Sequence, residues 1–369
     1  MHRLVVAFLT LVLFATACSS PTTPEAGERR TTPSRSEPAT PTPSPSETPE
    51  PSETPETDPS KQPSPSKQPS PKKTKVPQQV DPLSLPALFE KEYDGGDLRL
   101  GQVLAETDAY TRYFVTYRSN NLRISGILNV PRGKGPFPAL VLAHGYIDPS
   151  YYVNGQGLMR EQDWLARAGY VVLHTDYRNH AASSDDPSAE RKLRLGYTTD
   201  TINAVKALRK TGNVPVNDNK VGLLGRSMGG GVVYNVLTAQ PNLVDAAVAY
   251  APVSSSVADN FNHFTRDDDG DDALTDFILR KYGEPRAHRE FWRAVSPRTY
   301  FDRIEDPLLI HHGTADESCP IRWSRTSQRL LSEAGVDSRL LIYPGEPHAF
   351  IADWPLSMRR TVDFFRARL

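Results

Sequence analysis

The run Val221-Gly222-Leu223-Leu224-Gly225-Arg226-Ser227-Met228-Gly229 is the most informative part of this chain. A short apolar segment leads into the pattern Gly-x-Ser-x-Gly, and a helix-compatible stretch follows as far as Ala239. A strand, a sharp turn and a helix in this order expose a serine hydroxyl at the end of the strand, and the two glycines keep other side chains from colliding with the strand and the helix. We therefore predict that Ser227 is a nucleophile; the alternative is a glycine-rich turn at a helix start.

A serine hydroxyl attacks well only when a base takes its proton and a carboxylate orients that base, so two further residues are expected later in the chain. Asp316 ends the run His312-Gly313-Thr314-Ala315-Asp316, and His348 ends the run Gly345-Glu346-Pro347-His348. Each run directly follows an apolar segment of the kind that forms a buried strand. Taken singly, Asp316 could be a loop carboxylate and His348 a surface histidine. The order Ser, Asp, His predicts a catalytic triad of Ser227, Asp316 and His348.

Acyl transfer also needs two backbone N–H groups aimed at the developing negative charge. Met228, directly after the nucleophile, supplies the first in our prediction. The second is expected in His144-Gly145-Tyr146, the loop after the apolar run 139–143. We assign it to the N–H of Tyr146, whose hydroxyl is a further candidate donor, and we expect His144 to be a structural hydrogen-bonding residue.

The order of apolar segments predicts an α/β fold with a mostly parallel sheet. An antiparallel hairpin is expected at the sheet edge, from 113–118 and 122–130 around Asn120-Asn121. Later strands are expected where short apolar runs are continuous, as strands covered on both faces require: 139–143, 170–175, 221–224, 246–250, 308–311 and 340–343. Helices are expected between them, including 201–210 and 355–369. Helices should therefore cover both faces of the sheet.

With these residues placed, the chain from about residue 98 to 369 resembles the α/β-hydrolase superfamily, and most closely the catalytic domain of the prolyl oligopeptidase family and its related esterases. The matching stretches are Gly225 to Gly230, Ser296 to Arg298 with Pro307 to Ile310, His312 to Asp316, and Pro344 to His348. The resemblance implies the α/β-hydrolase fold and a serine hydrolase with the triad above. These motifs are specific for the fold and the triad, and they say little about the substrate.

The chain departs from this family in two ways. Where the family has Val-Pro after the acid loop, this chain has Cys319-Pro320, and we expect Cys319 to be a small buried apolar residue with no redox role. Full-length members also carry a β-propeller before the hydrolase, which selects their substrates, whereas here a Pro-rich stretch precedes it. Substrate choice is therefore expected to come from an aromatic-rich insertion at residues 254–293, which could form a helical lid.

Several other polar groups are weaker candidates. The acidic run Asp267 to Asp272 lacks the spacing of a calcium loop, so a solvated turn is favoured over a metal site. His311 and His312 should face opposite ways in a strand and so cannot share a metal. Asp176, Arg178 and His180 could line the site, but a structural salt bridge is the favoured reading. The sequence thus indicates no metal and no cofactor.

The N-terminal region has the pattern of an exported protein. An apolar run from Leu4 to Ala15 is too short to span a bilayer but has the size of a signal-peptide core, and small residues precede Cys18. Residues 1–18 therefore predict a signal peptide whose end resembles a bacterial lipobox, which implies lipidation of Cys18; ordinary secretion is the alternative. Residues 19–80, rich in Pro, Ser, Thr and Glu, predict a disordered tether, and residues 81–369 the catalytic domain.

Taken together, the sequence predicts an exported serine hydrolase, anchored by lipid to the outer face of a bacterial membrane, that forms an acyl-enzyme on peptide or ester substrates. A prolyl-oligopeptidase-like peptidase is the first assignment and a carboxylesterase the second; a non-catalytic surface binding protein on the same scaffold is the alternative from another class. Lys and Arg number 43 against 44 for Asp and Glu, so no net field draws the protein to nucleic acid. The sequence does not indicate an oligomeric state.

Overall fold

The computed structural model describes residues 80–266 and 272–369. The predicted signal peptide, Cys18 and the tether up to residue 79 lie outside the described residues, as does the acidic run except Asp272. Within the two described ranges, no helix combines the length and the apolar character needed to cross a bilayer.

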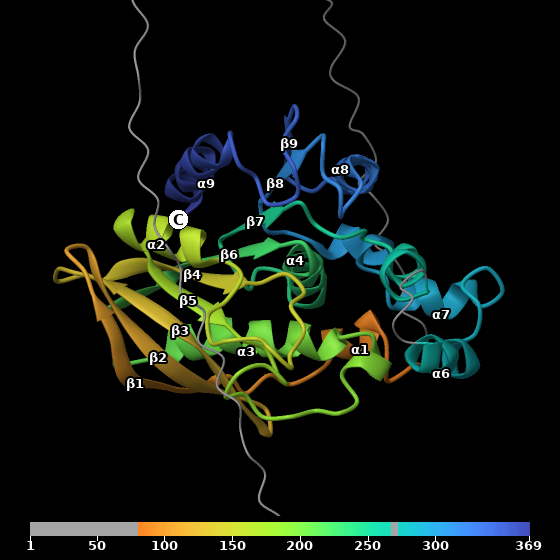
Figure 1. Cartoon of the computed structure of the whole chain (residues 1–369), viewed down its shortest axis with the longest axis horizontal. Coiled ribbons are helices and arrows are strands. Elements are labelled where there is room, and N and C mark those ends of the chain that lie inside the picture. The colour runs from red at the N-terminus through yellow and green to blue at the C-terminus, as the bar shows by residue number, and fades with distance from the viewer. Residues whose placement is uncertain (1–79, 267–271) are drawn as a thin grey trace, which may run out of the picture. The chain divides into compact units, whose positions relative to one another are not determined.

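Nine strands of the described chain form one sheet in the order β1-β2-β3-β5-β4-β6-β7-β8-β9 (Figure 1). The strands are β1 (Gly96–Glu106), β2 (Tyr110–Ser119), β3 (Leu122–Pro131), β4 (Phe137–Ala143), β5 (Val171–Thr175), β6 (Val216–Arg226), β7 (Ala246–Tyr250), β8 (Leu308–Gly313) and β9 (Ser338–Tyr343). Neighbours among β1, β2, β3 and β5 are antiparallel, and all pairs from β5 through β4 to β9 are parallel. This is the predicted mostly parallel sheet with antiparallel N-terminal strands.

The predicted hairpin is present as β2 and β3, but it does not form the edge of the sheet. β1 pairs with β2 and takes that place. In β1 only Gly96 and Leu98 are buried, and the other nine residues are exposed. Its alternation extends only from Leu98 to Leu100 and its apolar run only from Val103 to Ala105, and both are too short to predict a strand.

Helices cover both faces of the sheet, as predicted. α3 (Leu195–Lys210), α4 (Met228–Ala239) and α8 (Ile321–Glu333) pack on one face, and α2 (Met159–Arg167) and α9 (Trp354–Arg368) on the other. Successive side chains of β6 point to opposite faces. Leu223 accordingly joins a core cluster with Val233 of α4, while Leu224 joins a second cluster with Phe365 of α9. Both faces of the strand that leads to Ser227 are therefore fixed by packing.

The predicted lid region 254–293, between β7 and β8, contains short helices. They are α5 (Val257–Asn260), the π-helix η2 (Phe261–Arg266), α6 (Asp272–Tyr282) and α7 (Arg289–Ala294). The remaining short helices of the described chain are α1 (Leu85–Phe89), η1 (Glu190–Lys192) and η3 (Pro297–Arg303).

Candidate active site

Ser227 lies in the sharp turn between β6 and α4, where the sequence places it. Its backbone has φ 57° and ψ −120°, a strained conformation for a residue with a side chain. The turn is held because the Ser227 N–H donates to the carbonyl of Tyr250 at 2.9 Å and the N–H of Val253 donates to the carbonyl of Ser227 at 3.2 Å. Neighbouring β7 thus fixes the turn that presents the hydroxyl.

The two glycines of the motif are required by close backbone packing. A Cβ on Gly229 would lie 2.0 Å from the carbonyl oxygen of Ala143 in β4, and one on Gly225 would lie 2.2 Å from the carbonyl oxygen of Gly229. Both obstacles are backbone atoms, which cannot swing aside as a side chain does. The first turn of α4 therefore sits directly against the end of β4, beside the loop that carries Tyr146.

Asp316 and His348, from the loops after β8 and β9, form a hydrogen-bonded pair. Nδ1 of His348 lies 3.0 Å from Oδ1 and 2.9 Å from Oδ2 of Asp316. Because a carboxylate only accepts, Nδ1 carries the proton and Nε2 keeps its lone pair. The backbone N–H groups of Ser318 and Cys319 also donate to Oδ1, at 2.9 and 2.7 Å. This arrangement orients the imidazole as a base requires.

His312 is a further partner of Asp316, a role that the sequence did not predict. Its Nε2 lies 3.1 Å from Oδ2 of Asp316 and 2.8 Å from the carbonyl of Cys319, so Nε2 carries the proton; Nδ1 then accepts from the hydroxyl of Ser324 at 2.7 Å. Burial opposes ionisation of Asp316, but hydrogen bonds from His312, His348 and the Cys319 N–H hold the pKa of Asp316 well below its usual range. In the sequence, the four-residue spacing of His312 and Asp316 could have indicated this contact.

Cys319 connects Ser227 with Asp316. The cysteine is fully buried, as predicted from the sequence. Burial first, and then the charge of Asp316, raise the pKa of the Cys319 thiol, while a hydrogen bond with the side chain of Ser227 acts in the opposite direction. The side chain of Cys319 therefore contacts Ser227, and its backbone N–H contacts the carboxylate that holds His348. Cys319 thus lies against both Ser227 and Asp316, and His348 is bound through Asp316.

Met228 and Tyr146, the residues of the two predicted oxyanion donors, line one cavity together with Ser227. Met228 opens α4, and the position of a Cβ on Gly145, next to Tyr146, would be 3.2 Å from Cβ of Ser227. Among the described residues, no hydrogen-bond acceptor contacts the backbone N–H of Met228 or Tyr146. The half-exposed Tyr146 ring packs under the guanidinium of Arg194, whose Cζ is 4.4 Å from the ring centroid.

His144 and Asp176 lie beneath this loop. His144 is fully buried, and its Nδ1 is 2.6 Å from the carbonyl of Gly145. Burial and the neighbouring His174 and His180 keep the pKa of His144 well below its usual value, so the ring stays neutral. The buried Asp176 carboxylate accepts from the Tyr152 hydroxyl at 2.7 Å and from the Gly155 N–H at 2.9 Å. Both groups therefore support the loop after β4 and lie away from the reacting atoms.

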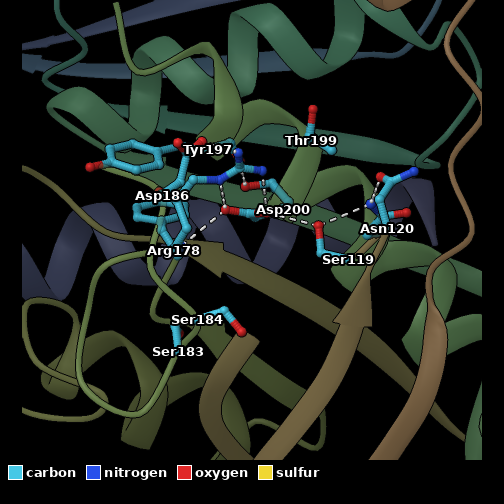
Figure 2. Close-up of polar contacts among 12 residues, drawn as sticks. Ser119, Asn120, Arg178, Ser183, Ser184, Asp186, Tyr197, Thr199 and Asp200 are labelled. Atoms are coloured by element: carbon cyan, nitrogen blue, oxygen red, sulfur yellow. Dashed lines mark hydrogen bonds and ion pairs between the residues drawn. The ribbon is translucent and has the colours of Figure 1, made fainter. Parts of the chain in front are cut away.

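Arg178 forms the salt bridges that the sequence analysis favoured. Its guanidinium contacts Asp186 at 2.9 Å and the buried Asp200 at 2.9 Å. Figure 2 shows the Asp200 carboxylate between Arg178 and Ser119, whose hydroxyl donates to it at 2.7 Å. The three residues tie the β5 loop to α3 and β2. α3 begins at Leu195, six residues before the predicted start. Its first two turns carry buried polar side chains, among them Asp200, and tertiary contacts such as these satisfy their hydrogen bonds.

A cavity of 280 Å³ opens beside Ser227, between the first turns of α4, the segment 190–197 and the predicted lid region. Its walls are mostly apolar, with side chains from three helices and one loop: Val232 on α4, Phe261 and Phe264 on η2, Leu274 and Ile278 on α6, and Leu193 in the loop before α3. The lid region therefore contributes to the wall of the candidate site. Residues 190–197 also contribute to this wall, which no pattern in the sequence predicted. Within the described ranges, no group of three or more His, Cys, Asp and Glu side chains could hold a metal ion.

Residues 156–369 match the model of the prolyl oligopeptidase family. The chain belongs to this family. It is a serine hydrolase on the α/β-hydrolase fold, and both peptidases and esterases are among its relatives. The resemblance stated from Ser227, Asp316 and His348 is thereby confirmed at the level of the family.

Three similarities indicate the range of this family and fold. The uncharacterized peptidase YuxL of Bacillus subtilis is 27% identical over 219 residues, which are 58% of this chain and 31% of that protein. The acylaminoacyl peptidase of Pyrococcus horikoshii aligns with a TM-score of 0.57 at 22% identity, over 71% of this chain and 42% of that one. Acetyl xylan esterase 1 of Thermoanaerobacterium aligns with a TM-score of 0.55 at 20% identity, over 73% of this chain and 88% of that one. The chain spans about a third of the curated peptidase that it matches.

Proposed function

We propose that Ser227, His348 and Asp316 are the catalytic triad of this hydrolase. The observation that carries the proposal is the orientation of His348: Asp316 fixes its Nδ1 proton, and Nε2 is left as the free base. Ser227, Asp316 and His348 follow β6, β8 and β9, all of which run parallel, so they lie at the same edge of the sheet.

The reaction then proceeds in two acyl transfers. Nε2 of His348 takes the hydroxyl proton as Oγ of Ser227 attacks the substrate carbonyl carbon, and the carbonyl electron pair moves onto oxygen. Collapse of this intermediate expels the amine or alcohol, which takes the proton from His348 and leaves an ester on Ser227. Water repeats the sequence and releases the acid. Asp316 stays ionised throughout and stabilises the imidazolium.

The oxyanion formed in each step is stabilised by the N–H groups of Met228 and Tyr146 in this proposal. Among the described residues neither N–H has an acceptor, and Met228 and Tyr146 line the same cavity as Ser227, which supports the assignment. Removal of one such donor costs about 2.7 to 4 kcal/mol of transition-state stabilisation in comparable sites. The stacked Arg194 holds Tyr146 in place without contributing a proton.

We propose that the bond cleaved is a peptide bond, in line with the family to which the chain belongs. A carboxylesterase is the second candidate, because the chain covers 88% of an acetyl xylan esterase of the same fold but 42% of an acylaminoacyl peptidase. The part of the substrate that enters the cavity is small in either case, since the cavity holds 280 Å³.

We further propose that the enzyme is exported and anchored to the outer face of the membrane through Cys18, with residues 19–80 as the tether. The apolar run ending at Ala15 and the position of Cys18 support this proposal. Metabolic labelling with an alkyne fatty acid, compared with a Cys18→Ser variant, tests it: label that persists in the variant contradicts lipidation at this cysteine.

The type of bond is tested by turnover of short acyl esters against peptide anilides, with Ser227→Ala as the control for background hydrolysis. A peptidase cleaves both. Ester turnover without anilide turnover assigns the chain to the carboxylesterases, and turnover that survives Ser227→Ala contradicts the serine mechanism.

A further inference from the structure

Ser227 and His348 follow strands that do not adjoin. β6 leads to Ser227 and β9 leads to His348, and β7 and β8 lie between them in the sheet. The Ser227 N–H ties the nucleophile turn, the turn that carries Ser227, to the Tyr250 carbonyl of β7. Asp316 ties His348 to the loop after β8. The distance from Oγ to Nε2 therefore depends on how the turn after β6 and the loop after β9 are held relative to each other.

A buried carboxylate on α2 contacts both of these segments. Glu161 is 1% exposed, and its Oε1 accepts from Nη2 of Arg226, the residue directly before Ser227. The same oxygen accepts from Nε1 of Trp354 at 2.8 Å. Trp354 opens α9, six residues after His348, and α9 lies beside α2 on one face of the sheet (Figure 1). One atom of Glu161 thus joins the nucleophile turn to the chain that continues from the base.

Arg160, next to Glu161 on α2, contacts the loop of the base directly. Its Nη2 donates to the carbonyl of Ala349 at 2.7 Å, and its Nη1 donates to the carbonyl of Phe350 at 3.3 Å. These carbonyls belong to the two residues that follow the base. Cζ of Arg160 also lies 4.7 Å from the ring centroid of Trp354, and its Nη2 lies 3.8 Å from Oε1 of Glu161. Adjacent residues of α2 therefore hold the chain after the base at two places.

The contact between Glu161 and Arg226 pairs two charges that have little access to water. The side chain of Arg226 is 11% exposed and that of Glu161 1%. Removal of one member of such a pair leaves the other charge buried without compensation, so the pair holds its geometry. Cζ of Arg226 also lies 5.6 Å from the ring centroid of Tyr250, whose carbonyl accepts from the Ser227 N–H. Glu161 therefore fixes a guanidinium that packs beside the nucleophile turn.

We propose that Glu161 is a positioning residue that sets the distance between the Ser227 hydroxyl and the His348 base. This inference rests on the proposed triad and names a residue that supports it. The described residues that line the cavity beside Ser227 include neither Glu161 nor Arg160. Glu161 therefore acts through its hydrogen-bond partners, and its loss should slow the proton transfer and leave substrate binding in place.

The rate of labelling by a fluorophosphonate probe measures this positioning. Oγ displaces fluoride from the phosphorus of the probe as the base takes the hydroxyl proton. Glu161→Gln keeps the shape of the side chain and removes its charge, and we expect it to label about tenfold more slowly than the wild type. In a His348→Ala background the same change should have less than about a twofold effect, since the base that Glu161 positions is already absent. A purely structural role would slow labelling by the same factor in both backgrounds.

Arg160→Gln is a second variant, because this side chain is 47% exposed and Glu161 keeps its other partners. We expect kcat for a short acyl ester to fall by about threefold to tenfold, with KM changed by less than about twofold. Arg209→Gln is the matched control. Arg209 also donates to two backbone carbonyls, those of Asp218 and Leu243, but these lie near the starts of β6 and β7, at the edge of the sheet opposite the triad. Its kcat should equal that of the wild type.

The outcomes separate this inference from the proposed function. If the wild type is labelled on Ser227 and slowed by His348→Ala, but Glu161→Gln reacts at the wild-type rate or is slowed equally in the two backgrounds, the inference is wrong and the triad stands. If the wild type is not labelled on Ser227, both are wrong. Should Glu161→Gln fail to fold, Arg160→Gln is labelled in the same two backgrounds and is judged by the same outcomes.

Discussion

Nδ1 of His348 lies almost equally far from the two carboxylate oxygens of Asp316, at 3.0 and 2.9 Å, and this carboxylate has no exposed surface. Each oxygen also has a second donor, the Cys319 N–H on Oδ1 and His312 on Oδ2. A buried charge with four or more donors is held in one position and stays ionised. The orientation of His348 is therefore fixed by a carboxylate that is itself buried and held by hydrogen bonds.

Asp316→Asn should lower kcat by roughly 10² to 10⁴, because an amide that donates to Nδ1 imposes the wrong tautomer on His348. Steady-state kinetics on a short acyl ester measure this change. The exposed Asp218→Asn is the control and should leave kcat unchanged. A loss of less than about threefold for Asp316→Asn would mean that His348 does not depend on this carboxylate.

Asp316 should also make stability depend on pH. Its pKa is lower in the folded protein than the value of about 4 expected when unfolded, so its ionised form stabilises the fold above about pH 4, and this contribution is lost as the pH falls further. Urea unfolding of wild type and Asp316→Asn at pH 7 and pH 3 tests the sign: the wild type should lose more stability on acidification. An equal loss in both proteins would refute the assignment.

His312 is expected to act as a positioning residue. His312→Ala removes a buried donor from Asp316 and should lower kcat by about tenfold or more with little change in KM. His312→Gln keeps an N–H of similar reach and should recover part of the loss. A purely structural role would lower stability in both variants and leave the kcat of the folded protein unchanged.

The glycines of the nucleophile turn provide a stability test. Gly229→Ala should destabilise the protein by more than about 2 kcal/mol, since the new methyl group collides with backbone carbonyls of β4. Gly212→Ala is the matched control, because nothing lies within 4 Å of its Cβ position and its change should stay within about 1 kcal/mol. Chemical denaturation of the two variants makes the comparison. Similar stabilities would contradict the close approach of α4 to β4.

Cys319 should be inert in the folded enzyme. Its burial raises the pKa of the thiol, so little thiolate forms at neutral pH and reagents cannot reach it. In a Cys18→Ser background, a disulfide reagent should react with no thiol in native protein and with one in urea. Fast labelling of the native protein, with loss of ester turnover, would show instead that Cys319 is accessible beside Ser227.

The sequence predicted those parts of the fold whose residues are continuously apolar or chemically unusual. Leu223 and Leu224 identified a strand buried on both faces, and Ser227, Asp316 and His348 stood out because each follows such a strand. β1 was missed because its side chains face solvent. Arg194 was missed because its role follows from two consecutive left-handed residues, with φ 52° at Leu193 and 56° at Arg194, which turn a charged loop toward Tyr146. Such a conformation is fixed by tertiary contacts and leaves no local pattern.

Glu346 was missed for a related reason. The residue reads as a surface carboxylate in Gly345-Glu346-Pro347-His348, yet it is 3% exposed and accepts from the backbone N–H groups of Ile351 and Asp353. It therefore closes the loop that carries His348. The sequence identified the base but could not show the carboxylate that shapes its loop, because the acceptor role depends on where the chain returns after residue 348.

The claim that Ser227 is the nucleophile activated by His348 is tested most directly by labelling with a fluorophosphonate probe, followed by peptide mapping by mass spectrometry. Folded wild-type protein should carry one probe on the peptide containing Ser227, and His348→Ala should label at least about a hundredfold more slowly at the same protein concentration. Absence of label on Ser227 in folded wild type, or an unchanged rate in His348→Ala, would contradict the account.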